Sequence, residues 1–468
     1  MTQEIIKEEA IKNTKIAIVT QGLVLITSLI KSFIIPLLVS VESFGYWQIY
    51  LLYLPYIGLF YWGFNDGIYL RYGNYDYKDL PRKKFRSSIS IFFVCLVIET
   101  IIGILLLYFF NYSDKSLALM LVVFNIPIKG IYGTLIYVFQ ITNNIKKYCL
   151  YSLIDKVIFI LLLGSIFFIN EESYLYLIWA DIISSVLTTI FMIYENKEII
   201  FGKKEKIKTG IEEFFNNIKT GISLMIASFM ALILSNIGKI FVEQFNEVED
   251  YAYYSFGMMI INLLLVCFIS VSTVMYPMLK RMEKKDYGKQ FNVINKYYDI
   301  IALTGLVLYF IAYYGIILVF PKYMNVLAYL NILFAIVIFQ GKTILMNNTY
   351  YKILREEKRM MIDNTISIVI FVVLCMFSKS IIGISIITLI VMAHRAIDSE
   401  MLLRNKMGII KNNTLPILML GVSIFMVGTS INYILGLVSY LAFYLVYFLK
   451  NRKKFLDLLY LVLRRERR

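Results

Sequence analysis

The stretch TKIAIVTQGLVLITSLIKSFIIPLLVS, residues 14–40, decides the fold. It is long and apolar enough to cross a bilayer as a helix, which takes roughly 20 residues. It carries one deep cation, Lys31. The polar and aromatic segment VESFGYW follows at residues 41–47, and a second apolar run comes after it. The sequence here predicts two membrane-spanning helices joined by a short corner.

The same pattern returns about half a chain length later. Residues 223–242 form another apolar run with Lys239 near its end, and the segment VEDYAYY follows at residues 248–254. The first, second and sixth positions of the two corners are identical, and the other aromatic and small positions agree in type. A repeated helix, corner and helix predict two similar lobes in one membrane protein.

The composition agrees with an all-α polytopic membrane protein. Of the 468 residues, 59% are hydrophobic and only 17% are charged, whereas soluble domains carry about a quarter of charged residues. The four cysteines lie in apolar runs without metal-binding spacing, so we expect neither a metal nor a cofactor. The hydropathy pattern predicts about fourteen spans, at residues 15–38, 46–70, 88–110, 117–140, 150–169, 174–194, 220–242, 253–278, 298–320, 324–348, 361–377, 381–402, 414–431 and 433–449.

The loops between the predicted spans are alternately rich and poor in lysine and arginine. With the N-terminus placed inside, every inside loop carries at least two of them and no outside loop carries more than one. Basic residues are retained on the cytoplasmic side, so we predict an even number of spans with both termini cytoplasmic. The net charge of +15 then reflects topology and attraction to anionic membrane lipids, and nucleic-acid binding is excluded.

The spans divide into three predicted parts. Residues 1–205 form an N-terminal lobe with helices 1–6, and residues 206–405 form a C-terminal lobe with helices 7–12. Residues 406–468 add helices 13 and 14 and a basic cytoplasmic tail. Because six is even, both lobes enter the membrane in the same sense, and the repeats are parallel.

Cations inside the spans are the candidate functional residues. The sequence has no phosphate-binding loop, dinucleotide fingerprint or zinc-protease motif, so we do not expect an enzyme. Charged residues in spans usually face an interior cavity. Lys31 and Lys129 lie near the middle of their spans. Lys156, Lys239 and Lys342 lie near span ends. Their long side chains could equally well extend to the lipid headgroups without facing a cavity. Deep cations favour an anionic substrate, for which phosphate groups are the natural candidates.

Three acids also fall in the predicted spans. They are Asp66 in the second, Glu99 in the third and Asp181 in the sixth. Either each neutralises one of the lysines, or one of them takes up a proton during transport. Arg71 closes the second span, and Arg395 in the twelfth has acids nearby.

Three motifs carry a resemblance to a known family. They are the corner at residues 41–47, the segment WGFNDGI at residues 62–68 with Arg71 behind it, and the segment YPMLKR at residues 276–281. They resemble the polysaccharide-transporter branch of the multidrug/oligosaccharidyl-lipid/polysaccharide (MOP) exporter superfamily, and the chain looks like a Wzx-type O-antigen or capsule flippase. The resemblance covers nearly the whole chain, including the two additional C-terminal helices.

This resemblance implies a function. Such flippases carry undecaprenyl-pyrophosphate-linked oligosaccharides across the bacterial cytoplasmic membrane by alternating access around a cationic cavity, and polysaccharide polymerases and glycosyltransferases are the expected partners. It makes Lys31, Lys129 and Lys239 candidate headgroup-binding residues, followed by Lys342, Arg71 and Arg395.

Two other functions compete with this one. A cation-coupled multidrug exporter of the same superfamily is the first, but its branch has a carboxylate in the first helix, and this chain has none there. A membrane-bound glycosyltransferase or polymerase is the second, and the short outside loops argue against it.

Overall fold

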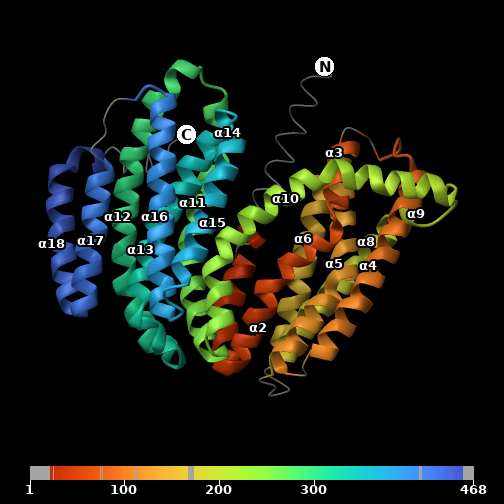
Figure 1. Ribbon diagram of the computed structural model, residues 1–468, viewed down its shortest axis with the longest axis horizontal. Helices are drawn as coiled ribbons and strands as arrows, with labels where there is room; N and C mark the ends of the chain where they lie inside the picture. Colours follow the sequence, from red (N-terminus) through yellow and green to blue (C-terminus); the bar gives the residue numbers. More distant parts are fainter. Residues whose placement is uncertain are drawn as a thin grey trace. The chain divides into compact units, whose positions relative to one another are not determined.

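The computed structural model describes residues 20, 22–24, 26–73, 75, 77–110, 113–166, 173–409 and 414–456. Within them the chain is helical and contains no strand (Figure 1). It divides into two compact units, Met1–Leu232 and Ile233–Arg468. The predicted basic tail lies outside the described residues from position 457 onward, and the three predicted parts of the chain stay a prediction.

The first unit contains the helices before α10 and the first part of α10 itself. In chain order they are the first helix (Gly22–Leu38), α2 (Val41–Tyr53), η1 (Leu54–Tyr61), α3 (Phe64–Tyr72), α4 (Arg82–Phe110), α5 (Asp114–Ile141), α6 (Ile145–Gly164), α8 (Tyr174–Glu195), α9 (Lys197–Ile200) and α10 (Ile207–Phe245). Helix α5 is central, because it packs against α2, α3, α4, α6 and α8.

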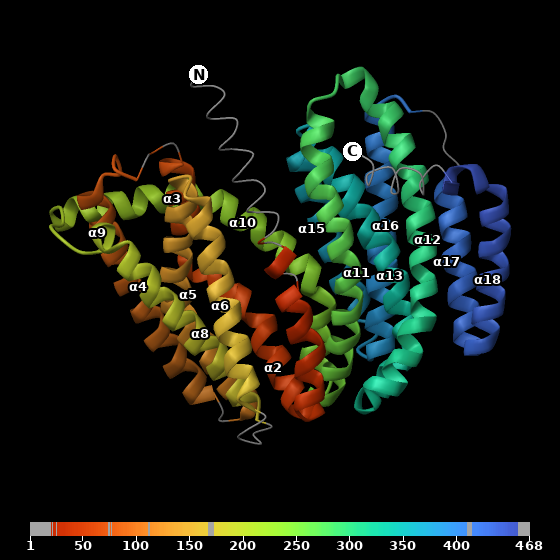
Figure 2. The same cartoon turned by 180° about the vertical axis from the view of Figure 1, so that it is seen from behind.

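The second unit begins within α10 and repeats the long-helix architecture. Its elements are α11 (Val248–Lys280), η2 (Lys284–Asp286), α12 (Tyr287–Val319), η3 (Pro321–Ala328), α13 (Leu330–Lys342), the π-helical turn η4 (Thr343–Asn347), α14 (Asn348–Ile353), α15 (Glu357–Cys375), α16 (Ile381–Lys406), α17 (Thr414–Ile431) and α18 (Tyr433–Lys450). Helices α17 and α18 pack side by side against α12 at the edge of this unit (Figure 2).

The two repeated corners are the first turns of helices rather than loops between them. Both α2 and α11 begin at the shared valine, Val41 and Val248. Trp47 and Tyr254, which occupy the same place in the repeat, are both buried. The repeat therefore fixes where each helix starts and which aromatic face it packs into the unit.

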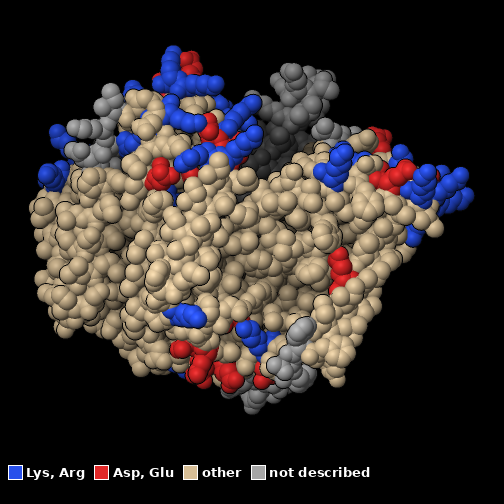
Figure 3. Space-filling model, in the orientation of Figure 1, with Lys and Arg blue, Asp and Glu red and all other residues tan. Residues whose placement is uncertain are grey.

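Where the structure describes them, the predicted spans lie mainly on helical structure. Within the described residues, nine helices are long and apolar enough to cross a membrane, and two shorter apolar helices accompany them. The chain is a multi-pass membrane protein, whereas the number fourteen stays a prediction. In each unit, Lys and Arg gather at one end, and a broad band with few charged residues follows below them (Figure 3).

The second predicted span is broken rather than continuous. Pro55 lies in the first turn of η1, and the element ends at Trp62 and Gly63, which adopt left-handed φ angles of 51° and 78°. A tryptophan rarely adopts this conformation, and it persists only where the surroundings enforce it. The Trp62 indole donates a hydrogen bond of 2.8 Å to Glu99 of α4, which holds the break in place.

Helix α3 approaches the first part of α10 through glycines. A Cβ atom on Gly67 would lie 1.9 Å from the carbonyl oxygen of Asn217, and one on Gly221 would lie 2.0 Å from that of Gly63. Small residues allow two membrane helices to pack backbone against backbone. The broken span is therefore held directly against α10 within the first unit.

Replacing Gly67 by alanine is expected to lower the free energy of unfolding by about 1–3 kcal/mol, because the α3 and α10 backbones must separate. The matched control is Gly315→Ala in α12, where a Cβ meets nothing within 4 Å and the alanine favours the helix. Thermal unfolding of both variants in detergent measures the difference. Equal melting temperatures for the two variants would contradict the close α3–α10 contact.

Candidate functional site

Three lysines and two aspartates gather inside the first unit. We call this set, Lys31, Lys129, Lys156, Asp155 and Asp181, the lysine cluster. The charges that act on Lys31 are those of the other four members. The first helix, α5, α6 and α8 supply the cluster, and α8 packs against both α5 and α6. Two of the lysines predicted to bind a headgroup, Lys31 and Lys129, and one predicted acid, Asp181, are therefore brought together.

Lys129 on α5 is bound to α8. Its ammonium group lies 3.3 Å from the Asp181 carboxylate and donates a hydrogen bond of 2.5 Å to Ser185. The Tyr50 hydroxyl of α2 donates to Asp181 over 2.8 Å, and Asn125 in turn donates to Tyr50 over 3.1 Å. Asp181 thus neutralises Lys129 in a network that ties α2, α5 and α8 together.

Asp155 is a cluster member that the sequence analysis did not select. It is buried, lies 2.7 Å from the Lys156 ammonium group and accepts hydrogen bonds of 3.2 Å from Ser184 and Ser185. The available signal was an acid directly beside a lysine within an apolar run. Lys156 is therefore paired within the unit and does not serve only to reach the headgroups.

Lys31 is the cluster member without an acid partner among the described residues. Its ammonium group lies 3.2 Å from the centroid of the Phe159 ring on α6, which is a cation–π contact. Because the aspartates pair with Lys129 and Lys156, Lys31 is the one lysine of the cluster that neither aspartate pairs with. A lysine held in this way inside a membrane unit is able to receive an anionic group.

The second unit holds its deep lysine differently. Lys342, at the end of α13, is fully buried and lies 2.6 Å from Glu400 of α16. Glu400 also pairs with Arg404 over 2.5 Å and accepts a hydrogen bond of 2.7 Å from Asn295 of α12. The π-helical turn η4 follows Lys342 directly. This network fixes Lys342 against protein groups.

The other predicted cations lie at separate places. Arg71 pairs with Glu213 over 2.6 Å and therefore ties α3 to α10. Arg395 on α16 donates a hydrogen bond of 2.6 Å to the Asn364 side chain of α15, so an amide and not a neighbouring acid receives it. Lys239 is partly buried on α10 in the second unit.

The other two predicted acids lie apart from the lysine cluster. Asp66, in the first turn of α3, accepts a hydrogen bond of 3.5 Å from Tyr137 of α5. Glu99 accepts from Trp62, at the break of the second span. Neither Asp66 nor Glu99 forms an ion pair within the described residues. A role in proton coupling stays a prediction for both of them and for Asp181.

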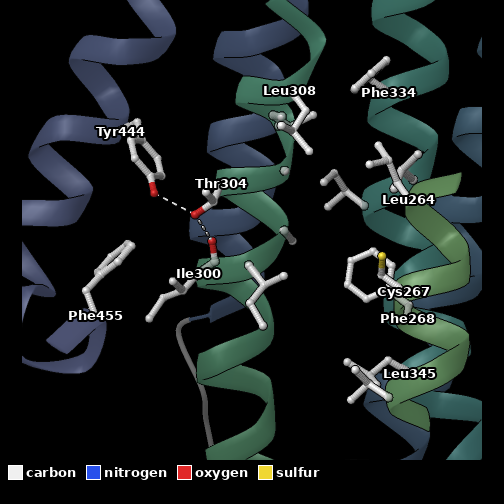
Figure 4. Close-up of a pocket in the computed structure, with 17 residues that line it drawn as sticks. Leu264, Cys267, Phe268, Ile300, Thr304, Leu308, Phe334, Leu345, Tyr444 and Phe455 are labelled. Carbon is white, nitrogen blue, oxygen red and sulfur yellow. Dashed lines mark hydrogen bonds between the residues drawn. The ribbon is translucent and has the colours of Figure 1, made fainter. Parts of the chain in front are cut away.

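An apolar cavity of about 610 Å³ lies in the second unit among α11, α12 and α13. Leu264, Cys267 and Phe268 line one side, and residues from Ile300 to Leu308 line another (Figure 4). Two polar side chains that line it, Tyr444 of α18 and Thr304, are hydrogen-bonded to each other over 2.7 Å. The cavity suits an apolar chain.

The fold is similar to those of solved transporters of the MOP superfamily. The fold is similar to "Lipid II flippase MurJ, inward closed conformation", with a TM-score of 0.65, 15% identity and coverage of 94% of this chain and 99% of that one. It is also similar to an outward-facing multidrug resistance MATE family transporter of the MOP superfamily, with a TM-score of 0.55, 13% identity and coverage of 85% and 96%. A MOP superfamily transporter from Pyrococcus furiosus matches with a TM-score of 0.53, 12% identity and coverage of 86% and 96%.

The family model for "Polysaccharide biosynthesis protein" matches residues 10–283, so the chain belongs to this family. No curated protein matches the sequence. Family and fold together confirm the predicted resemblance to the polysaccharide-transporter branch of the superfamily.

Proposed function

We propose that this protein is a flippase that moves undecaprenyl-pyrophosphate-linked oligosaccharide repeat units from the inner to the outer leaflet of a bacterial cytoplasmic membrane. The observation that carries the proposal is the excess of lysines over aspartates in the lysine cluster, three against two, with the Lys31 ammonium group on the Phe159 ring. A lipid-linked pyrophosphate is an anion of the kind that a lysine binds as a point charge.

Two further observations support the same substrate. The family model that matches this chain describes polysaccharide biosynthesis, and a protein of similar fold is a lipid II flippase. The apolar cavity of the second unit offers the surface that a polyprenyl chain requires. In this proposal both termini are cytoplasmic, the two units alternate access, and a polysaccharide polymerase and glycosyltransferases act on the same lipid-linked units.

The fold likeness to a MATE transporter keeps a cation-coupled multidrug exporter as the second candidate. Purified protein in proteoliposomes separates the two functions. One assay follows a fluorescent undecaprenyl-pyrophosphate disaccharide between the leaflets, and the other follows ethidium under a proton or sodium gradient. We expect leaflet exchange of the lipid and no ethidium movement above that of empty liposomes. Ethidium transport without lipid exchange would contradict the proposal.

A further inference from the structure

The first part of α10 and the segment before it lie across one end of the first unit, whereas α4 and α5 run along the unit (Figures 1 and 2). They belong to residues 195–219, the loop predicted between the sixth and seventh spans on the cytoplasmic side. A helix that lies across the ends of membrane-spanning helices can rest at the boundary between lipid headgroups and acyl chains. It does so when it offers that boundary an apolar face beside a charged one.

One face of this part of α10 is fixed to the first unit. Its buried residues recur at helical spacing: Gly210, Glu213, Phe214, Asn217 and Gly221. The segment before the helix is also held, because the Arg86 side chain of α4 donates hydrogen bonds to the carbonyl oxygens of Glu198 and Lys203. The remaining faces of the helix therefore have a defined orientation at this end of the unit.

The exposed side of α10 carries an apolar stripe beside a polar one. Ile207, Ile211 and Phe215 follow one another at intervals of four residues, which places them on one face, and they are 78%, 41% and 59% exposed. The residues one position later are exposed as well and form the polar stripe: Lys208, Glu212 and Asn216. Two such stripes side by side are typical of a helix that lies in a membrane interface.

The same stretch carries an excess of positive charge. Its exposed lysines lie before α10 and in its first turn, and they are Lys203, Lys204, Lys206 and Lys208. The acids of residues 201–215 are Glu205, Glu212 and Glu213, and Glu213 already pairs with Arg71 of α3. Four lysines therefore stand against two remaining acids, and lysines beside an anionic leaflet are attracted to its headgroups.

We call the exposed apolar and positive side chains together the connector surface: Phe201, Lys203, Lys204, Lys206, Ile207, Lys208, Ile211 and Phe215. We propose that the connector surface binds anionic phospholipids of the inner leaflet, with its lysines at the lipid phosphates and its apolar side chains between the upper parts of the acyl chains. The excess of lysines selects an anionic leaflet, and the apolar stripe selects a bilayer over a soluble acidic partner. The inference goes beyond the proposed function, because it concerns the bulk lipid and not the translocated unit.

The depth of the apolar stripe can be measured with two neighbouring tryptophans. Full-length Phe215→Trp and Asn216→Trp are placed in nanodiscs of equal parts phosphatidylcholine and phosphatidylglycerol, and the phosphatidylglycerol is brominated near the start of its acyl chains. We expect this lipid to reduce the additional emission of Phe215→Trp, relative to the wild type with its three tryptophans, about twofold or more. Asn216→Trp, which lies on the polar stripe, is the matched control and should not be quenched.

The charge of the surface is tested by lipid titration. Native mass spectrometry of the full-length protein in detergent measures its affinity for phosphatidylglycerol and for phosphatidylcholine. Replacing the four lysines of the connector surface by glutamine should weaken the binding of phosphatidylglycerol about tenfold or more, because each lysine contributes attraction, and leave that of phosphatidylcholine unchanged. The control replaces three exposed lysines of another predicted cytoplasmic loop and should bind phosphatidylglycerol like the wild type: Lys284→Gln, Lys285→Gln and Lys289→Gln.

Two results would overturn the proposal. If neither tryptophan is quenched, or both are quenched equally, the apolar stripe does not face the bilayer and another protein becomes its occupant. If both lysine variants lose the same affinity for phosphatidylglycerol, the connector surface attracts lipid no better than any other basic loop. The substituted side chains are exposed, so wild-type melting temperatures verify that all variants are folded. Neither measurement involves leaflet exchange, so failure of the connector surface leaves the flippase proposal standing.

Discussion

Glu400→Ala is expected to lower the free energy of unfolding by about 3–5 kcal/mol, because it leaves a buried cation without its partner. Lys342 is fully buried, and Glu400 is the acid paired with it, 2.6 Å away. Arg404 and Asn295 lose the same carboxylate. Unfolding with sodium dodecyl sulfate in mixed micelles measures the change.

An exposed pair of the same length provides the control. Lys285 and Glu283 are also 2.6 Å apart, but their side chains are 74% and 71% exposed. Water screens such a pair, so Glu283→Ala should change stability by at most about 1 kcal/mol. Similar losses for the two alanine variants would show that burial does not determine the strength of the Lys342–Glu400 pair.

A double variant separates the stranded charge from lost packing. In Lys342→Met with Glu400→Gln, the buried ion pair is replaced by an apolar and a neutral side chain. We expect this variant to recover more than half of the stability that Glu400→Ala loses, because no unpaired ammonium group remains in the unit. A double variant as unstable as the single one would assign the loss to the Arg404 and Asn295 contacts instead.

The sequence predicts the membrane fold well because each span is a local property of about 20 residues. The corner repeat recurs at the starts of α2 and α11, but the predicted spans begin at residues 46 and 253, whereas the helices already begin at Val41 and Val248. The partners of the lysines cannot be predicted in this way, because they depend on which helix faces pack against each other. The sequence does not identify Asp155, because its neighbour Lys156 could equally well extend to the lipid headgroups. Ser184 and Ser185 donate hydrogen bonds to Asp155 only because α6 packs against α8.

The break at Trp62 is a second feature that the hydropathy of the sequence does not predict. Hydropathy alone reads residues 46–70 as one span, since the apolar run continues through η1. The left-handed φ angle of Trp62 is enforced by tertiary contacts, namely the indole hydrogen bond to Glu99 and the close approach of Gly63 to Ile222. Irregular backbone inside a membrane protein is tolerated only where protein groups satisfy it.

Lys31→Gln is expected to reduce leaflet exchange of the undecaprenyl-pyrophosphate disaccharide by about 30-fold or more, because a desolvated charge contact to a phosphate is lost. Lys31 is the informative single substitution. Lys129→Gln would also leave Asp181 without its ion pair, so its effect mixes substrate binding with stability. Replacing Lys31 and Lys129 together should abolish exchange and, in cells, surface polysaccharide, while the protein remains in the membrane.

The matched control for Lys31 is a lysine that also faces an aromatic ring but lies outside the unit's interior. Lys197 is exposed on α9, and its ammonium group lies 5.4 Å from the Tyr194 ring centroid. Lys197→Gln should therefore exchange the lipid at the wild-type rate, and Lys31→Arg, which keeps the charge, should retain more activity than Lys31→Gln. Wild-type exchange in Lys31→Gln would remove the cation from the transport mechanism, because Lys31 is the one member of the cluster whose charge no aspartate of the cluster pairs with.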